Sequence, residues 1–290
     1  MMFQRTAIMY GEPLCRKLQS GCVAICGAGA VGSFAAEALC RLGVGEFHIF
    51  DFDVFEQSNK NRQLCALDST IGKSKAQVQC GRILDINPHA RAIAHNVFID
   101  ETSLGQIFDA KPDVIVDAID SVRSKVLLAC AAIERGVPIV SSMGAARKKN
   151  PLEVKTADIF KTYACPLAAR IRKSLRQNGI KKGYKCVFSS EIVEEQTHLS
   201  ACRQEILHGD GADPRRRRAP SEGEHFGFEG EYEPSGSEAG CVASSVLRGR
   251  ADASELGVRK TKIIGSSIIV TGVFGLNLAN LALEEFSNKK

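Results

Sequence analysis

The stretch from Gly21 to Asp53 constrains the fold more than any other part of the chain. It runs from an apolar segment, 22–26, through a glycine-rich turn into a helix pattern, and a second apolar segment, 47–50, then stops at Asp51. This order predicts a βαβ unit, in which a nucleotide lies across the carboxyl ends of the strands. The glycines of the turn are Gly27, Gly29 and Gly32.

The glycine turn predicts contact with a phosphate. Glycine lets the backbone turn tightly and approach a ligand, and the start of the next helix offers free N–H groups and a positive dipole end. Asp51 comes 22 residues after Gly29, where a carboxylate can hold a ribose hydroxyl. By itself such a turn is typical of NAD or FAD enzymes, so the turn alone is also consistent with a dinucleotide-binding oxidoreductase.

Strand and helix patterns continue to alternate up to about residue 145. A helix pattern over 72–86 precedes an alternating strand pattern over 92–98. The continuous apolar run 113–118 is typical of a strand buried on both faces of a parallel sheet. A helix over 126–133 and a strand over 138–141 follow. The expected fold class is α/β: a Rossmann-like, doubly wound, mainly parallel sheet with helices on both faces, plus a C-terminal extension.

Changes in composition divide the chain into five predicted segments. They are an N-terminal helical arm (1–20), a nucleotide-binding α/β domain (21–158), a basic helix and strand extension (159–199), an insertion (200–260) and a C-terminal apolar segment (261–290). Gly, Ser, Glu and Arg dominate the insertion, which we expect to be flexible. Polar residues and glycines interrupt the C-terminal segment, which favours a core or dimer-interface helix over a membrane span.

Cysteine usage and charge narrow the class of protein. Eleven cysteines without a secretory leader pattern are typical of a reducing compartment, so we expect a cytoplasmic location. No CxxC pair occurs, which argues against a structural zinc site. We expect Cys22 and Cys26 to act as small buried hydrophobes in the first strand. The net charge of +5 permits an anionic partner without requiring one.

The segment 159–190 carries eight lysines and arginines and no acidic residue. After Pro166, the residues Leu167, Ile171 and Leu175 recur at helical spacing, which predicts an amphipathic helix with a basic opposite side. The basic side is consistent both with a solvated charged face and with a nucleic-acid contact. The candidate nucleic-acid contacts are Arg170, Arg172, Lys173, Arg176, Lys181 and Lys182.

The residues that carry the chemistry follow the pattern DFDxxxxxNxxRQ, then GxxK, then DxxD. An oxidoreductase does not need an arginine, a lysine and a further carboxylate at one set of strand ends, whereas a nucleoside triphosphate does. Arg62 and Lys75 can neutralise phosphates and the charge on departing pyrophosphate, and Asp120 can hold magnesium. The predicted ATP-binding residues are Gly27, Gly29, Gly32, Asp51, Asp53, Asn59, Arg62, Gln63, Lys75 and Asp120, with Arg62, Lys75 and Asp120 as the catalytic residues.

Each of these side chains alone has a simpler explanation. Asp120 could cap the next helix, Arg62 could pair with Asp68, and Lys75 could be a surface charge. Asn59 could reach a phosphate or fix its own loop by hydrogen bonding. Their conjunction is what indicates a triphosphate site.

The motifs GAGAVG, DFD, NKNRQ, GKSK and DAIDS resemble those of the ubiquitin-activating-enzyme-like adenylyltransferases, the superfamily that includes ThiF, MoeB and HesA. Within it the chain resembles the tRNA threonylcarbamoyladenosine dehydratases. The narrower resemblance covers about residues 5–191 and 261–284. It rests on the segments INPHA at Ile86, DAIDSVRSK at Asp117, CPLAARIRKSLR at Cys165, KCVFSSE at Lys185 and GSSIIVTGVFG at Gly265.

The resemblance implies ATP-dependent activation of the threonine carboxylate of threonylcarbamoyladenosine in tRNA. Attack on the α-phosphate gives an acyl adenylate and pyrophosphate, and the substrate's own carbamoyl group then closes on the activated carbonyl and expels AMP. Positioning is the protein's main task, because the reacting groups are already tethered. The resemblance places Asp51 on the ribose, Arg62 and Lys75 on the phosphates and Asp120 on magnesium.

The resemblance also implies partners and leaves alternatives open. It implies tRNA as the partner and a homodimer in which Arg5 crosses to the neighbouring subunit's ATP, and it allows a cysteine desulfurase or sulfur acceptor. The main alternative is an adenylyltransferase that activates the C-terminus of a sulfur-carrier or ubiquitin-like protein, although such members often carry CxxC zinc ligands. A NAD-binding oxidoreductase and a non-catalytic RNA-binding relative are the others.

Overall fold

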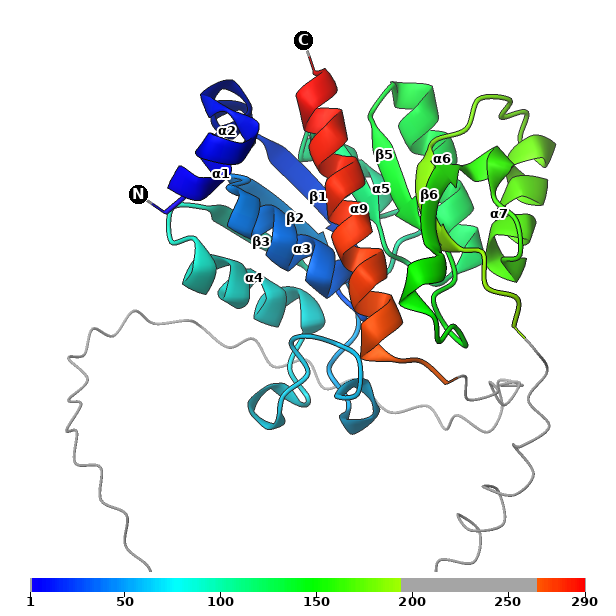
Figure 1. Ribbon diagram of the computed structural model, residues 1–290, viewed down its shortest axis with the longest axis horizontal. Coiled ribbons are helices and arrows are strands. Elements are labelled where there is room, and N and C mark those ends of the chain that lie inside the picture. The colour runs from blue at the N-terminus through cyan, green and yellow to red at the C-terminus, as the bar shows by residue number, and fades with distance from the viewer. Residues whose placement is uncertain (1, 194–264, 290) are drawn as a thin grey trace, which may run out of the picture. The chain divides into compact units, whose positions relative to one another are not determined.

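A seven-stranded sheet in the order β3-β2-β1-β4-β5-β7-β6 forms the centre of the computed structural model, which describes residues 2–193 and 265–289 (Figure 1). Neighbouring strands are parallel except β6 and β7, which pair antiparallel. The α/β class predicted from the sequence is confirmed. The strands are β1 (Cys22–Cys26), β2 (Glu46–Phe50), β3 (Arg91–His95), β4 (Val114–Asp117), β5 (Ile139–Ser142), β6 (Val154–Asp158) and β7 (Lys185–Ser189).

Helices cover both faces of the sheet because strand side chains alternate between the two faces. Val23 and Ile25 of β1 pack in the core with α3, α4 and α9, while Ala24 and Cys26 pack in the core with α5, α6 and α7. The helices are α1 (Gln4–Tyr10), α2 (Glu12–Gln19), α3 (Gly32–Leu42), α4 (Lys75–Ile86), α5 (Leu104–Asp109), α6 (Val122–Arg135), α7 (Pro166–Gln177) and α9 (Ile268–Asn288).

The strand order reverses between β1 and β4. From β1 the chain continues to β2 and β3 on one side, and it returns to place β4 and β5 on the other. At such a reversal the loops after the two central strands lead away from each other, which opens a crevice at their carboxyl ends. The glycine turn after β1 and the Asp120 loop after β4 both lie at this crevice.

The structure adds two elements that the sequence patterns did not predict. β6 is an edge strand of half-buried and exposed residues, so it lacks an apolar pattern, and α5 is a short helix of 6 residues. α7 begins at Pro166 as predicted and buries Ala168, Ile171 and Leu175. The predicted insertion at 200–260 lies outside the described residues.

α9 packs on α3 and on β4, β5 and β7 (Figure 1). Among the described helices, α9 is the one whose length and composition would allow it to cross a membrane, with a mean hydropathy of 1.3. However, 56% of its apolar stretch is buried inside the fold. Its contact with α3 is very close. A Cβ on Gly275 would lie 2.5 Å from both the Val31 carbonyl oxygen and the Phe34 Cβ. The apolar composition of α9 is therefore accounted for by its place in the core.

We predict that Gly275→Ala lowers the free energy of unfolding by about 1 to 3 kcal/mol, because the added methyl group has no room against α3. Gly81→Ala in α4 is the matched control, since among the described residues its added Cβ would meet no heavy atom within 4 Å other than the adjacent backbone of its own helix. It should stabilise by up to about 1 kcal/mol through helix propensity. Urea unfolding measures both, and equal effects of the two variants would contradict the close packing.

Candidate active site

The glycine turn lies between the carboxyl ends of β1 and β4. Gly27 has a φ of +94°, and a Cβ there would lie 2.8 Å from the carbonyl oxygen of Ala118. A Cβ on Gly32 would lie 1.7 Å from the Gly27 carbonyl oxygen, so the fold itself requires both glycines. Gly29 is different, because its Cβ would meet only the Gln63 side chain, whose Nε2 is 3.8 Å away. Its missing side chain leaves room for a ligand.

Asp51 follows β2 and fixes this turn. Its carboxylate accepts a hydrogen bond from the backbone N–H of Ala28 (2.7 Å) and another from that of Asp53 (2.9 Å). Burial raises the pKa of the Asp51 carboxyl above its usual value, although these two N–H groups and the Lys75 ammonium act in the opposite direction. The structure thus gives Asp51 a role in holding the turn, and its contact with a ribose stays a prediction.

Lys75 lies at the start of α4, and its Nζ is 2.9 Å from the Asp53 carboxylate. The lysine side chain is 8% exposed and that of Asp53 is 46% exposed. The simpler explanation, that Lys75 is a surface charge, is therefore wrong. Through Asp53 and Asp51 it is linked to the glycine turn.

The loop between β2 and α4 carries Asn59 and Arg62. Asn59 is buried, and its Oδ1 accepts a hydrogen bond from the Glu56 backbone N–H (3.2 Å). Of the two roles considered for Asn59, the structure shows loop fixation. The Arg62 guanidinium donates from Nη1 to the Ser58 carbonyl oxygen (2.8 Å) and to the Asn61 Oδ1 (2.9 Å). These neutral partners leave its positive charge without a counter-charge at those contacts.

Gln63 joins this loop to the glycine turn. Its side chain is buried with Nε2 toward Gly29, and its Oε1 has no hydrogen-bond partner among the described residues. A buried, unpaired acceptor costs free energy, so it commonly marks a place for a ligand or a water molecule. The unpaired side-chain oxygen Oε1 of Gln63 and the space beside Gly29 together suit a polar ligand bound in the turn.

Two simpler explanations from the sequence are wrong. Asp68 pairs with Lys60 (2.6 Å) and not with Arg62. α6 is capped by the Ser121 hydroxyl and not by Asp120, whose side chain is exposed at the crevice. Arg62 and Asp120 are therefore not accounted for by these local roles.

A buried ion pair that the sequence analysis missed holds the Asp120 loop. Lys125 of α6 donates to the Asp117 carboxylate (2.8 Å) and the Ser141 hydroxyl (3.1 Å), and both members of the ion pair are fully buried. The other Asp117 oxygen accepts from the backbone N–H of Ile119 (3.1 Å). Lys125 falls on the buried stripe of α6 with Leu128, and a lysine on an apolar stripe was the signal that could have revealed the pair.

We predict that Lys125→Met lowers the free energy of unfolding by about 3 to 5 kcal/mol, because it leaves the Asp117 carboxylate buried without a counter-charge. The matched control is Arg123→Met on the same helix, whose partner is the exposed Glu101. That variant should unfold at nearly the wild-type urea concentration. A small effect of Lys125→Met would contradict a structural role for the pair.

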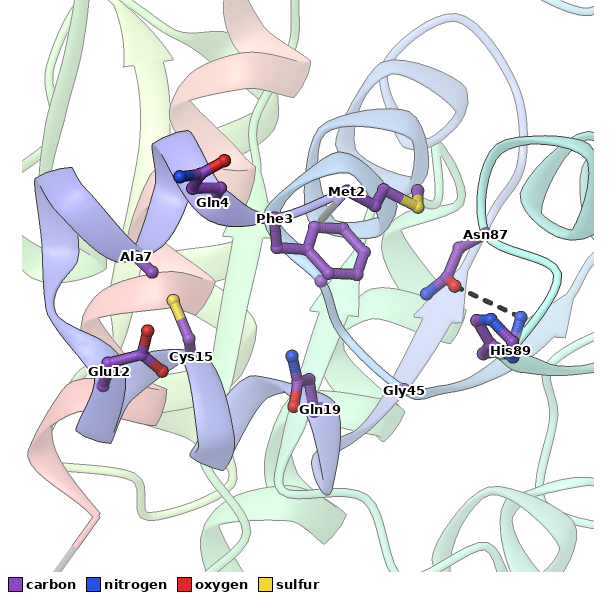
Figure 2. A pocket seen from close by; sticks show the side chains of 11 residues that line it. Met2, Phe3, Gln4, Ala7, Glu12, Cys15, Gln19, Gly45, Asn87 and His89 are labelled. Atoms are coloured by element: carbon purple, nitrogen blue, oxygen red, sulfur yellow. Dashed lines mark hydrogen bonds between the residues drawn. The ribbon is translucent and has the colours of Figure 1, made fainter.

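Arg5 lies far from this chain's glycine turn. It is exposed on α1, beside the amino-terminal ends of the strands, where the Phe3 ring lies against Gly43. A cavity of about 490 Å³ occurs at the same end, and its lining includes Phe3, Cys15 and Asn87 (Figure 2). Ligands of open α/β sheets bind at the carboxyl ends, so this cavity is separate from the candidate site. Arg5 is not brought to the other predicted residues within one chain.

The basic residues lie on and after α7. Arg172 donates to the Thr162 hydroxyl, and Arg176 stacks over the Phe160 ring with 5.2 Å between the guanidinium carbon and the ring centroid. The remaining candidates are exposed, so the predicted basic side of α7 is present. They are Arg170, Lys173, Lys181 and Lys182.

A family model described as the ThiF family matches residues 3–289. The chain belongs to the ThiF family. The superfamily resemblance drawn from the glycine, NKNRQ and DAIDS motifs is confirmed by this match.

Relatives of the ThiF-family chain include two bacterial proteins named tRNA threonylcarbamoyladenosine dehydratase. That of Bacillus subtilis is 39% identical over 222 residues, covering 76% of this chain and 85% of the relative. That of Escherichia coli is 35% identical over 208 residues, covering 69% and 78%. The crystal structure of E. coli TcdA in complex with AMP matches with a TM-score of 0.72 and 26% identity, covering 99% and 94%, and a structure of TcdA with ATP gives the same score.

Proposed function

We propose that this ThiF-family chain is an ATP-dependent tRNA threonylcarbamoyladenosine dehydratase. Two relatives that the chain matches over most of their length bear this name, and the similar E. coli TcdA has been solved with AMP and with ATP. The observation that carries the proposal is that three segments meet at the glycine turn. Gln63, next to Arg62, lies at Gly29, and Ala118, two residues before Asp120, lies at Gly27. Lys75 at the start of α4 is linked to the same turn through Asp53 and Asp51. A phosphate-releasing reaction needs such charges, and a hydride transfer does not.

ATP lies in this proposal with its phosphates against Gly29 and the first turn of α3. The free N–H groups of the helix start face the anion, and the buried acceptor of Gln63 gains a hydroxyl or amino partner from the nucleotide. Arg62 and Lys75 neutralise the phosphates and the charge that grows as pyrophosphate leaves. Asp51 keeps the turn closed around them, with its own contact to the ribose as the remaining prediction.

The chemistry then proceeds in two displacements. The threonine carboxylate oxygen bonds to the α-phosphorus while the bond to pyrophosphate breaks. The carbamoyl group of the same side chain next bonds to the activated carbonyl carbon, the bond to AMP breaks, and the carbamoyl N–H proton passes to solvent. The net change in the side chain is loss of one water molecule, because one carboxylate oxygen leaves on AMP and the proton is released. The protein holds the tethered groups in line, which is sufficient for a large rate gain.

Magnesium fits the Asp120 carboxylate. An exposed carboxylate beside the phosphates is a hard oxygen ligand that lets the ion keep several waters, as magnesium prefers. The bound ion would add positive charge beside the departing pyrophosphate. Asp120 is held for this role by the loop that the buried Asp117 anchors.

The partners follow from the exposed surfaces. The basic side of α7 provides charge for the tRNA backbone, as proposed from its sequence. α1 exposes Ile8 (79%) and Met9 (74%), which suits a homodimer in which Arg5 crosses to the neighbouring ATP site. A cysteine desulfurase or sulfur acceptor as partner, and a cytoplasmic location, stay predictions.

We predict that the protein with ATP removes the mass of one water molecule from threonylcarbamoyladenosine in tRNA and releases AMP and pyrophosphate. Lys75→Met should slow AMP release by about 100- to 1,000-fold, because it removes a charge that stabilises the transition state. Lys60→Met, in the loop between β2 and α4, is the matched control and should retain the wild-type rate. Mass analysis of the tRNA nucleosides and AMP measurement give the readouts. Equal turnover with unmodified tRNA, or without RNA, would refute the substrate.

We predict that the double variant Arg170→Gln and Lys173→Gln weakens tRNA binding. Each phosphate contact removed lowers the slope of log affinity against log salt concentration by about 1, so the loss of both contacts should lower it by about 2. Arg16→Gln with Lys17→Gln on α2 removes the same charge from another surface and serves as the control. Fluorescence anisotropy at several salt concentrations measures the slope, and equal slopes for the two double variants would exclude α7 from the interface.

A further inference from the structure

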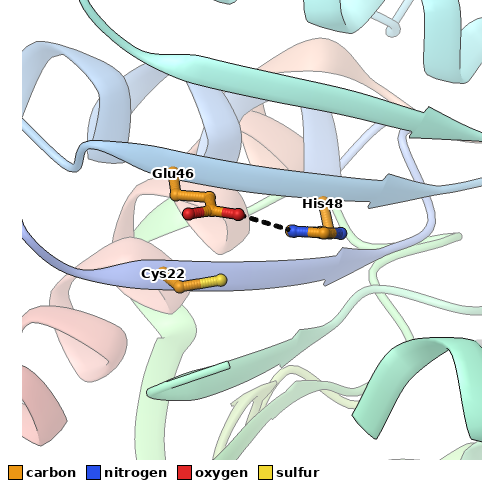
Figure 3. A group of neighbouring side chains, drawn as sticks. All are labelled: Cys22, Glu46 and His48. Atoms are coloured by element: carbon orange, nitrogen blue, oxygen red, sulfur yellow. Dashed lines mark hydrogen bonds and ion pairs between the residues drawn. The ribbon is translucent and has the colours of Figure 1, made fainter. Parts of the chain in front are cut away.

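Three side chains with metal-binding atoms meet at the amino ends of β1 and β2 (Figure 3). Cys22 and Glu46 are the first residues of these strands and are paired in register. His48 lies two residues further along β2 and therefore points to the same face of the sheet. One atom from each side chain, a sulfur, a carboxylate oxygen and an imidazole nitrogen, lies within 4.8 Å of the other two.

The chemistry of this set fits zinc. Thiolate sulfur, imidazole nitrogen and carboxylate oxygen are its usual protein ligands, bound at about 2.0 to 2.3 Å in a tetrahedron. Three atoms within 4.8 Å of one another can surround such an ion after small side-chain rotations. The Glu46 side chain is 29% exposed and that of His48 is 9% exposed. His48 is thus nearly buried, whereas Glu46 is partly in contact with solvent.

One of the ligands, His48, is held as metal ligands are commonly held. His48 Nδ1 is 3.0 Å from His95 Nε2, which leaves Nε2 of His48 directed at Glu46 Oε1 (3.0 Å). Such a hydrogen bond to the outer side of a ligand fixes its orientation and raises metal affinity. The same Glu46 oxygen, Oε1, accepts from Arg91 Nη1 (3.0 Å). The Arg91 side chain is 70% exposed, so its ion pair is weak and can give way to a cation.

We propose that Cys22, Glu46 and His48 form a zinc site that joins β1 to β2, with a water molecule as the fourth ligand. Binding forms a bond from Cys22 Sγ to the ion and releases the thiol proton to solvent. The site is about 16 Å from the glycine turn, since about five residues of β1 separate them at about 3.3 Å each. Its role is therefore structural, and it is independent of ATP turnover.

The proposal is tested on the full chain after EDTA treatment, first with Co²⁺ as a spectroscopic probe and then with Zn²⁺ in competition. We expect one equivalent of Co²⁺ to produce a thiolate-to-cobalt absorption band, one equivalent of Zn²⁺ to remove it, and Zn²⁺ to raise the melting temperature. Wild-type protein without a stoichiometric band overturns the proposal, whatever the variants do.

Variants locate the site. Cys22→Ser should abolish the band, whereas the control Cys130→Ser on α6 should retain it. His48→Gln should weaken Zn²⁺ binding, and His95→Ala should weaken it by about 10- to 100-fold as the loss of an orienting partner does. The control His89→Gln should bind as the wild type does. A band that persists in Cys22→Ser, or that Cys130→Ser removes, places the metal elsewhere and overturns the proposal. If Cys22→Ser does not fold, the two His48 and His95 variants decide.

Discussion

The carboxylate of Asp51 is the contact on which the arrangement of the candidate site depends. One oxygen holds Ala28 in the glycine turn and the other holds Asp53 in the next loop, so the segments after β1 and β2 are fixed to each other. Asp53 in turn faces Lys75 at the start of α4. Burying a carboxylate is costly unless it is hydrogen-bonded, and the two N–H groups offset that cost. Two neighbouring carboxylates, Asp51 and Asp53, thus join the glycine turn after β1 and the start of α4 to the end of β2.

On the opposite side of the crevice, a buried aspartate likewise holds the loop that follows its strand. Asp117 is the last residue of β4, and its carboxylate holds the backbone of its own loop at Ile119 while Lys125 neutralises it from α6. Both sides of the strand-order reversal therefore end in a buried aspartate that fixes the loop after it. Loops held in this way keep their geometry before a ligand arrives, which is what positioning catalysis requires.

The elements that the sequence predicted are those with strong local patterns. The βαβ unit follows from glycine spacing and apolar runs, and α7 from its helical spacing after Pro166. The edge strand β6 could not be predicted, because half-buried and exposed residues leave no apolar alternation. The proposed pairing of Arg62 with Asp68 was wrong, because the loop between β2 and α4 brings Lys60 to Asp68 instead.

Contacts between strands are harder to infer than elements. The meeting of Cys22 with Glu46 depends on the register of β1 against β2, and nothing in either segment alone specifies it. The absence of CxxC pairs argues against zinc on sequence spacing alone, but strand pairing can bring ligands together without close spacing. By contrast, Lys125 stands on an apolar helix stripe, so its burial against a carboxylate could have been inferred.

The position of α9 has a consequence for how the chain reaches its native state. This helix is synthesised after every strand of the sheet, yet Val270, Phe274 and Leu278 belong to the same core as β1 and α3. While a ribosome is still adding the preceding residues, the part of this face that α9 later covers, over β4, β5 and β7, presents apolar surface to water. Completion of the fold is thus a late event in synthesis, and the nascent chain depends until then on protection from aggregation.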